Sequence, residues 1–306
     1  MRRFLIKISQ YFLLLILLIF LLISSMLWIN RKINLPFTSN SVSFNAKAKF
    51  IHEHESLFNR SKFLIIGSSM SLNNLDCQQI QDSFKTPVIN LSSWGMKPAD
   101  FDDFNIWTKD KTIMMDLYFE DFGESDIKKN FGYPLSQNKF IDYVDVASDF
   151  YTYLACISMY KEYIRKDESR DYSYLVFDAT GTILFNDPQF VISKERWNFS
   201  KAVFSEKDMA DYVDFIIKKS KLVNKIIICF SPGRRIQYSS LRSNSVKGIE
   251  KSIMENCKNV IFINKYDSDM PESDFVDMCH MRGSGAKRFT ADIINDLKKD
   301  KNFNVN

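Results

Sequence analysis

Three serines crowd a turn near the start of the chain, within the sequence FLIIGSSMSLNN at residues 63–74. The four apolar residues before the turn are typical of a strand buried on both faces, and the Gly-Ser-Ser that follows is turn chemistry. This stretch alone leaves two interpretations open. The serines could cap the next helix, or one of them could be a nucleophile, which then needs a base from elsewhere in the chain.

A base and its partner stand near the C-terminus, in the sequence DMCHMRGSGAKRFT. Asp277 precedes His280 by three residues, in a loop that enters a helix. At this spacing the carboxylate can accept a hydrogen bond from one imidazole nitrogen, which orients the ring and stabilises its protonated form. The other nitrogen is then available to take a proton from a hydroxyl.

Other chemistry at these residues is less favoured. His52 and His54 flank a glutamate, but a metal site needs a further ligand and no other histidine is nearby. Cys279 is next to His280, yet adjacent side chains in a tight loop seldom point at each other, so a Cys–His dyad is not predicted. Five cysteines without a CxxC pair do not form a disulfide framework. We predict no metal, no cofactor, and buried inert thiols with at most one bridged pair.

Strands and helices alternate along the body of the chain, which indicates a parallel sheet covered by helices. The five predicted strands comprise residues 62–66, 87–91, 112–119, 224–230 and 259–263. The predicted fold is a three-layer, flavodoxin-like, doubly wound α/β domain. Ligands of such sheets bind beyond the carboxyl ends of the strands, so the serines at residues 68 and 69 after the first strand, and Asp277 and His280 after the last, should meet at one edge.

Two further loops end at the same edge. After the second strand, VINLSSWGMKP carries Gly95, where the backbone can approach a ligand closely and point its N–H at an oxyanion. After the fourth strand, SPGRRIQY carries Arg234 and Arg235, which could hold an anionic polymer or phosphate; a solvated basic loop is an equal alternative. A hydroxyl, an imidazole and a carboxylate in one crevice are the groups that acyl transfer needs.

These blocks, in this order, resemble the SGNH, or GDSL-like, hydrolase superfamily. The family's Gly-Asp-Ser block is similar to residues 67–69, and its Asp-x-x-His block is similar to Asp277 and His280. The resemblance implies that Ser69 is the nucleophile, His280 its base and Asp277 the partner of the base. It also implies an oxyanion hole made by the backbone N–H groups of Ser69 and Gly95.

The resemblance covers about residues 62–122 and 222–298, with two departures. Ser68 stands where the family has aspartate, a form similar to the membrane-anchored branch that handles cell-surface polymers. The family's Gly-x-Asn-Asp block is missing, and Asp116 and Tyr118 lie near the place of its asparagine. The Tyr118 hydroxyl could replace the absent oxyanion donor, or Tyr118 could belong to the core.

An uncharged run rich in leucine and isoleucine occupies residues 8–30 and is long enough to cross a bilayer as a helix. It is longer than a signal-peptide core and lacks a good cleavage site, so we predict a retained single-pass anchor. Basic residues flank both ends, but large following domains translocate largely regardless of charge. We expect a cytoplasmic N-terminus in a bacterial cytoplasmic membrane and an extracytoplasmic body.

These segments set the predicted domain boundaries. Residues 1–30 hold the cytoplasmic tip and the anchor, 31–61 form a polar juxtamembrane linker, and 62–306 form the α/β domain. About a hundred residues separate the third and fourth strands, too many for a simple crossover. Residues 123–221 are therefore predicted to be an insertion, with amphipathic helices and a hairpin that turns near Gly181.

Composition excludes one class of partner. The net charge of +4 is mild and spread along the chain, without the dense basic stripe typical of nucleic-acid binding.

With the resemblance, the site implies a serine O-acyl esterase or acyltransferase acting on a cell-envelope polysaccharide; its partners would be an acylated glycan or acyl donor and a membrane acyltransferase. The alternative is a catalytically weak or inactive SGNH-fold module that binds glycan or supports such a complex. The predicted anchor disfavours a secreted lipase.

Overall fold

The structure is a computed structural model that describes residues 2–32, 41–102, 104, 106–122, 176–186, 205–235, 238–301 and 303. The chain forms two compact units. One contains Met1–Lys49 and Lys128–Asp167, and the other contains Phe50–Ile127 and Glu168–Asn306. The second unit holds the sheet and all the predicted site residues.

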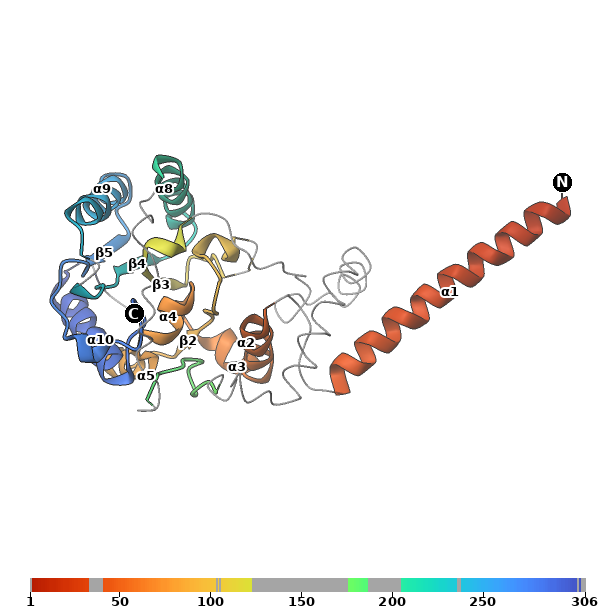
Figure 1. The fold of residues 1–306 in the computed structure, drawn as a ribbon, viewed down its shortest axis with the longest axis horizontal. Coiled ribbons are helices and arrows are strands. Elements are labelled where there is room, and N and C mark those ends of the chain that lie inside the picture. Colours follow the sequence, from red (N-terminus) through yellow and green to blue (C-terminus); the bar gives the residue numbers. More distant parts are fainter. Residues whose placement is uncertain are drawn as a thin grey trace. The chain divides into compact units, whose positions relative to one another are not determined.

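Five parallel strands form one sheet in the order β2-β1-β3-β4-β5 (Figure 1). They are β1 (Phe63–Ile65), β2 (Val88–Asn90), β3 (Thr112–Leu117), β4 (Lys225–Phe230) and β5 (Val260–Asn264). Each falls on a predicted strand. The all-parallel order is consistent with a flavodoxin-like fold, and it confirms the predicted α/β class and five-stranded sheet.

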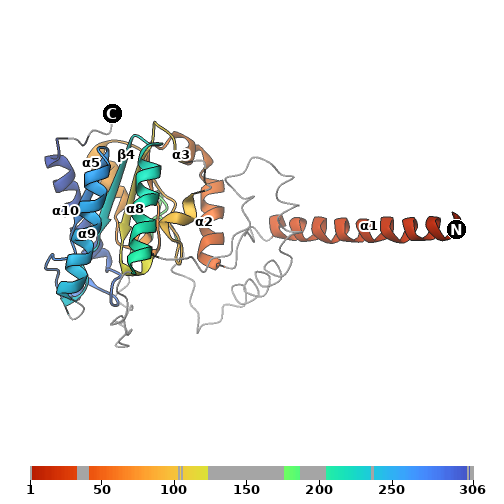
Figure 2. The ribbon, with the colours of Figure 1, turned by 90° about the horizontal axis from the view of Figure 1, so that it is seen from above.

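Helices cover both faces of this sheet, as its apolar strands require. α5 (Cys77–Phe84) and α10 (Gly283–Lys299) pack together on one face (Figures 1 and 2). α8 (Glu206–Ser220) and α9 (Ser240–Asn256) pack together on the other. Helices between the strands are what the alternating pattern in the sequence predicts. This arrangement leaves the carboxyl ends of the strands to the loops that carry the predicted site.

One apolar cluster joins α5 and α10 to the sheet. Its members come from both helices and from all five strands, and include Phe63, Val88, Met114, Ile227, Ile261, Ile80 and Phe289. Because β1, β3 and β4 are buried along their whole length, the loops at their carboxyl ends start from fixed positions. The cluster therefore provides a rigid base for the site.

The stretch predicted as a polar linker, residues 31–61, differs from that prediction. It contains α2 (Val42–Glu53) and α3 (Glu55–Arg60). The buried apolar side chains of these helices include Phe44, Ala48, Ile51 and Leu57. Polar residues dominate the sequence, but a helix needs only one apolar stripe, and these residues provide it.

Most of the predicted insertion, residues 123–221, lies outside the described residues, including its predicted amphipathic helices. The described part contains α8 and residues 176–186. There the chain turns near Gly181, whose N–H donates to a carbonyl three residues earlier at 3.0 Å. Within 176–186 no paired hairpin strands are formed; instead Phe185 makes a parallel bridge with Arg282.

The predicted anchor, residues 8–30, falls within the single helix α1 (Arg2–Lys32). Across the part of the chain that the structure describes, no helix is both long enough and apolar enough to span a membrane. The anchor stays a prediction from the sequence.

Candidate active site

The serine-rich turn lies where β1 ends and the short helix α4 (Ser69–Asn73) begins. Gly67 has a φ of 135°, which disfavours side chains, and a Cβ there would lie 2.5 Å from the Ser71 hydroxyl. Ser68 caps α4, because its hydroxyl accepts a hydrogen bond from a backbone N–H of the helix at 3.1 Å. Ser69 is only partly buried. The two interpretations of this turn therefore apply to different serines, with Ser68 as the cap and Ser69 at the surface of the site.

The third serine of the turn, Ser71, ties it to β3. Its hydroxyl donates to the carbonyl of Asp116 at 3.0 Å and accepts from the N–H of Asp116 at 2.8 Å. On the other side, the carbonyl of Gly67 accepts from the N–H of Ser93 at 3.3 Å. The turn is thus held between β3 and the loop that follows β2, which fixes the position of the serine beside it.

The loop between β5 and α10 carries the predicted base. Asp277 Oδ1 accepts hydrogen bonds from the backbone N–H groups of Cys279 at 2.9 Å and His280 at 2.8 Å. This local turn is the physical reason that an aspartate three residues before a histidine brings the two side chains together. The carbonyl of His280 also accepts from the N–H of Val276 at 2.9 Å, which fixes the backbone of the loop.

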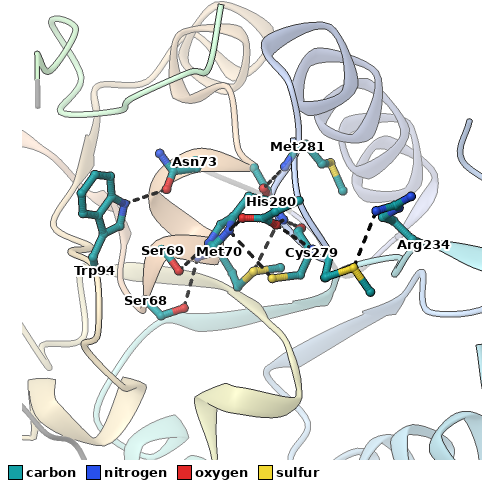
Figure 3. A network of polar contacts seen from close by, with 12 residues as sticks. Ser68, Ser69, Met70, Asn73, Trp94, Arg234, Cys279, His280 and Met281 are labelled. Atoms are coloured by element: carbon teal, nitrogen blue, oxygen red, sulfur yellow. Dashed lines mark hydrogen bonds and ion pairs between the residues drawn. The ribbon is translucent and has the colours of Figure 1, made fainter. Parts of the chain in front are cut away.

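Three side chains from segments far apart in the sequence form one hydrogen-bonded chain (Figure 3). His280 Nδ1 lies 2.6 Å from Asp277 Oδ2, and His280 Nε2 lies 2.7 Å from Ser69 Oγ. In the neutral ring, Nδ1–H donates to the carboxylate and Nε2 accepts from the hydroxyl. The structure therefore brings together the hydroxyl, imidazole and carboxylate that the sequence patterns single out.

The surroundings shift both titratable groups of this chain. Burial by itself would raise the pKa of Asp277, but hydrogen bonds from the His280 ring and from two backbone N–H groups lower it below its ordinary value. Burial would lower the pKa of His280, but the neighbouring Cys279 sulfur and the Asp277 carboxylate raise it well above its ordinary value. The site therefore favours an imidazolium held against a carboxylate, the ion pair that general-base catalysis must form.

The loop after β2 lies beside the serine-rich turn. Trp94 donates its indole N–H to Asn73 Oδ1 at 2.9 Å, which fixes this loop to α4 (Figure 3). The next residue, Gly95, is exposed and has a φ of 75°. A left-handed glycine in this loop is compatible with the predicted oxyanion donor.

Tyr118 packs as a core residue. Its ring is 1% exposed and lies 5.2 Å from the ring of Phe119 and 6.4 Å from that of Phe230. Its hydroxyl lies so close to Gly233 that a Cβ there would be 2.9 Å from it. This packing favours the core interpretation of Tyr118 over a role in the oxyanion hole.

Both arginines of the loop after β4 are paired with carboxylates. Arg234 Nε lies 2.5 Å from Glu272 Oε2, and one of its terminal nitrogens lies 3.6 Å from the Met278 sulfur (Figure 3). Arg235 pairs with Asp269, and the Arg235 side chain is 71% exposed. A guanidinium already paired with a carboxylate is less available to a second anion, so these contacts favour a structural loop over an anion site.

One group in the described residues has donor atoms close enough to share a metal: Asp277, Cys279 and His280, within 4.8 Å of one another. However, Asp277 Oδ2 and His280 Nδ1 are 2.6 Å apart, the distance of a hydrogen bond. Two ligands about 2.0–2.2 Å from one zinc ion would stand farther apart at a tetrahedral angle. The donor set fits a hydrogen-bonded pair better than a metal site.

The sequence patterns do not indicate two further buried side chains, Asn74 and Ser231. Both lie near the triad formed by Ser69, His280 and Asp277. Asn74 Oδ1 accepts from the N–H of Met281 at 2.9 Å, and its Nδ2 donates to the carbonyl of Cys279 at 3.2 Å. Asn74 is the C-cap residue of α4. Nothing local indicates that its partners lie more than two hundred residues away.

No protein-family model and no curated protein matches this chain. The assignment of chemistry to this site therefore depends on its residues and their geometry.

Proposed function

We propose that the chain is an SGNH-type serine O-acyl esterase or O-acyltransferase. The observation that carries the proposal is the hydrogen-bonded chain of Ser69, His280 and Asp277, with its 2.7 Å and 2.6 Å contacts. A serine, a histidine and a carboxylate in this order form the constellation that activates a hydroxyl for attack on a carbonyl. The nucleophile after the first strand and the acid–base pair after the last also agree with the SGNH resemblance.

In the first step, Ser69 Oγ attacks the carbonyl carbon of an acyl ester, and its proton passes to His280 Nε2. Asp277 stabilises the imidazolium through Nδ1–H. The backbone N–H groups of Ser69 and Gly95 would donate to the oxyanion of the tetrahedral intermediate. The intermediate then breaks its bond to the leaving alcohol, which takes the proton from His280, and an acyl ester on Ser69 remains.

In the second step, water or a sugar hydroxyl attacks the acyl carbonyl and gives its proton to His280. Release of the acyl group returns that proton to Ser69 Oγ. Water as the acceptor gives an esterase, and a sugar hydroxyl gives a transferase. The same residues serve both reactions, so the acceptor is a question of what reaches the site.

The proposed substrate is an acylated cell-envelope polysaccharide or its acyl donor. Two features support this part: the apolar run at residues 8–30, which we interpret as an anchor that keeps the domain outside the cytoplasmic membrane, and the Gly-Ser-Ser form of the nucleophile turn. A membrane acyltransferase is the proposed partner, because it could supply the acyl group from the other side of the bilayer.

A second candidate is a catalytically weak or inactive SGNH-fold module that binds glycan or supports such a complex. The packing of Tyr118 in the core favours it, because no side chain has then been assigned to the missing oxyanion donor. Loss of one such donor can lower a rate by about 10²–10³-fold.

A serine-directed fluorophosphonate separates the two candidates. The full chain, purified in detergent, is incubated with the probe and, separately, with a chromogenic acetyl ester. We expect labelling and ester hydrolysis in the parent, and loss of both in Ser69→Ala and His280→Ala. Ser245→Ala is the control, since Ser245 lies on α9 and its hydroxyl donates to a carbonyl of its own helix. An unlabelled parent at every pH tested would instead favour the binding module.

A further inference from the structure

A buried polar network behind the triad holds the backbone on both sides of His280. Asn74 Nδ2 donates to the carbonyl of Cys279 at 3.2 Å, and Asn74 Oδ1 accepts from the N–H of Met281 at 2.9 Å. These two peptide groups flank His280 directly. Because one is an acceptor and the other a donor, only this orientation of the side-chain amide satisfies both.

The network continues from Asn74 into the centre of the sheet. Asn74 Nδ2 also donates to Ser231 Oγ at 3.2 Å, and Ser231 Oγ donates to Asp116 Oδ2 at 2.6 Å. All three side chains are fully buried. Four parts of the fold are thereby connected: α4 with the nucleophile, the ends of β3 and β4, and the loop with the base.

Burial raises the pKa of Asp116 well above its ordinary value, although the hydrogen bond from Ser231 opposes this effect. A neutral carboxyl at the end of the network avoids an uncompensated charge in the core. The mechanism proposed above uses neither Asp116, Ser231 nor Asn74, so their burial and connection call for another role.

We propose that Asn74 is a positioning residue that holds the His280 ring between Asp277 and Ser69, with Ser231 and Asp116 as the support that fixes the Asn74 amide. The proposal rests on the proposed function, because it assigns His280 as the base. It deepens that function by adding a residue that never touches substrate. Asn74 acts through the backbone, and small displacements of a catalytic group can cost a large part of a rate.

The neighbouring asparagine provides a matched control. Asn73 is equally buried and makes two hydrogen bonds at 2.9 Å, to the carbonyl of Ile183 and from the indole of Trp94. None of these partners belongs to the loop that carries His280. Asn73→Ala removes the two buried hydrogen bonds named here, and Asn74→Ala removes the three to Cys279, Met281 and Ser231. Only the second substitution loosens the base.

The test uses the full chain in detergent with isotope-labelled histidine, since three histidines give few signals. The pKa of the His280 ring is measured by NMR, and the His280 signal is assigned by its absence in His280→Gln. The rate of fluorophosphonate labelling is measured on the same proteins. In Asn74→Ala we expect the His280 pKa to fall by about one pH unit, because the ring loses its fixed place beside the carboxylate. We also expect labelling to slow by about tenfold or more. Asn73→Ala should keep the parent's titration.

A folded Asn74→Ala variant that titrates like the parent would overturn the proposal, and so would an equal shift in Asn73→Ala. If Asn74→Ala does not fold, Ser231→Ala decides: a lowered His280 pKa supports the network, and an unchanged one rejects it. The titration needs no turnover. A parent that the probe does not label therefore contradicts the proposed function alone and leaves the positioning role to be decided by NMR.

Discussion

At the scale of single residues, the proposed chemistry depends on the charge on His280. Only the neutral ring can accept the hydroxyl proton, because the imidazolium has hydrogen on both nitrogens. The Cys279 sulfur, 3.9 Å from Nδ1, and the Asp277 carboxylate together raise the pKa of this ring well above its ordinary value despite burial. The same contacts that orient the base therefore keep it protonated to a higher pH.

We expect the rate of fluorophosphonate labelling to rise with pH, with a midpoint above the ordinary histidine value of about 6.5. The sign follows from the raised pKa of His280, since the active neutral ring appears only as pH passes that pKa. Cys279→Ala should move the midpoint to lower pH. Labelling measured from pH 5 to 10 checks this, and a midpoint at or below the ordinary value would contradict it.

The sequence predicts the triad but not the residue that braces it, and the reason is local. An aspartate three residues before a histidine forms its own turn, through N–H groups of residues 279 and 280. Asn74, by contrast, meets its partners only after the sheet has formed. The spacing of residues in a sequence indicates contacts between residues a few positions apart. It does not indicate hydrogen bonds such as those of Asn74, whose partners are far away in the chain.

At the scale of elements, the strands were predictable and the loops around them only partly so. Continuous apolar runs mark β1 and β4 because both faces of these strands are covered. α2 and α3 were not predicted, because polar residues outnumber the few apolar residues of their buried stripe and the segment was interpreted as a linker. The turn near Gly181 was placed correctly, but within residues 176–186 its backbone groups find partners other than a paired strand.

The junction of β1 and α4 depends on one glycine. We expect Gly67→Ala to lower the free energy of unfolding by about 1–3 kcal/mol, because alanine disfavours this backbone conformation and its Cβ meets Ser71. Denaturant unfolding of the full chain measures the change. Gly248→Ala is the control: a Cβ on that α9 residue meets nothing within 4 Å, so it should raise stability by about 0.5–1 kcal/mol. Equal effects in both variants would argue against the strained turn.

At the scale of the whole molecule, a carboxyl group lies at the centre of the sheet. Asp116 is fully buried on β3, and burial raises its pKa well above the ordinary value. The unfolded chain ionises this group near pH 3.9, whereas the folded chain retains the proton to higher pH. Above pH 4 the unfolded state therefore binds fewer protons at this site, and the folded state loses relative stability as pH rises.

We expect Asp116→Asn to gain stability relative to the parent as pH rises from about 4, by up to about 1.4 kcal/mol per pH unit until the folded pKa is passed. The asparagine has no ionisable group, so only the parent carries this penalty. Thermal unfolding of both proteins at several pH values measures the difference. Asp211→Asn, on the exposed side of α8, is the control. A stability difference between the parent and Asp116→Asn that stays constant with pH would contradict the expectation.

The two halves of the triad stand 211 residues apart in the chain, and this separation has a consequence for biosynthesis. A ribosome makes Ser69 early and His280 late. Every nascent chain that still lacks the loop after β5 carries the serine without its base. The hydroxyl is then an ordinary alcohol, unable to react with the esters around it. If the proposed function holds, reactivity would arise only once the last strand has taken its place in the sheet, and completion of the fold would itself switch on the chemistry.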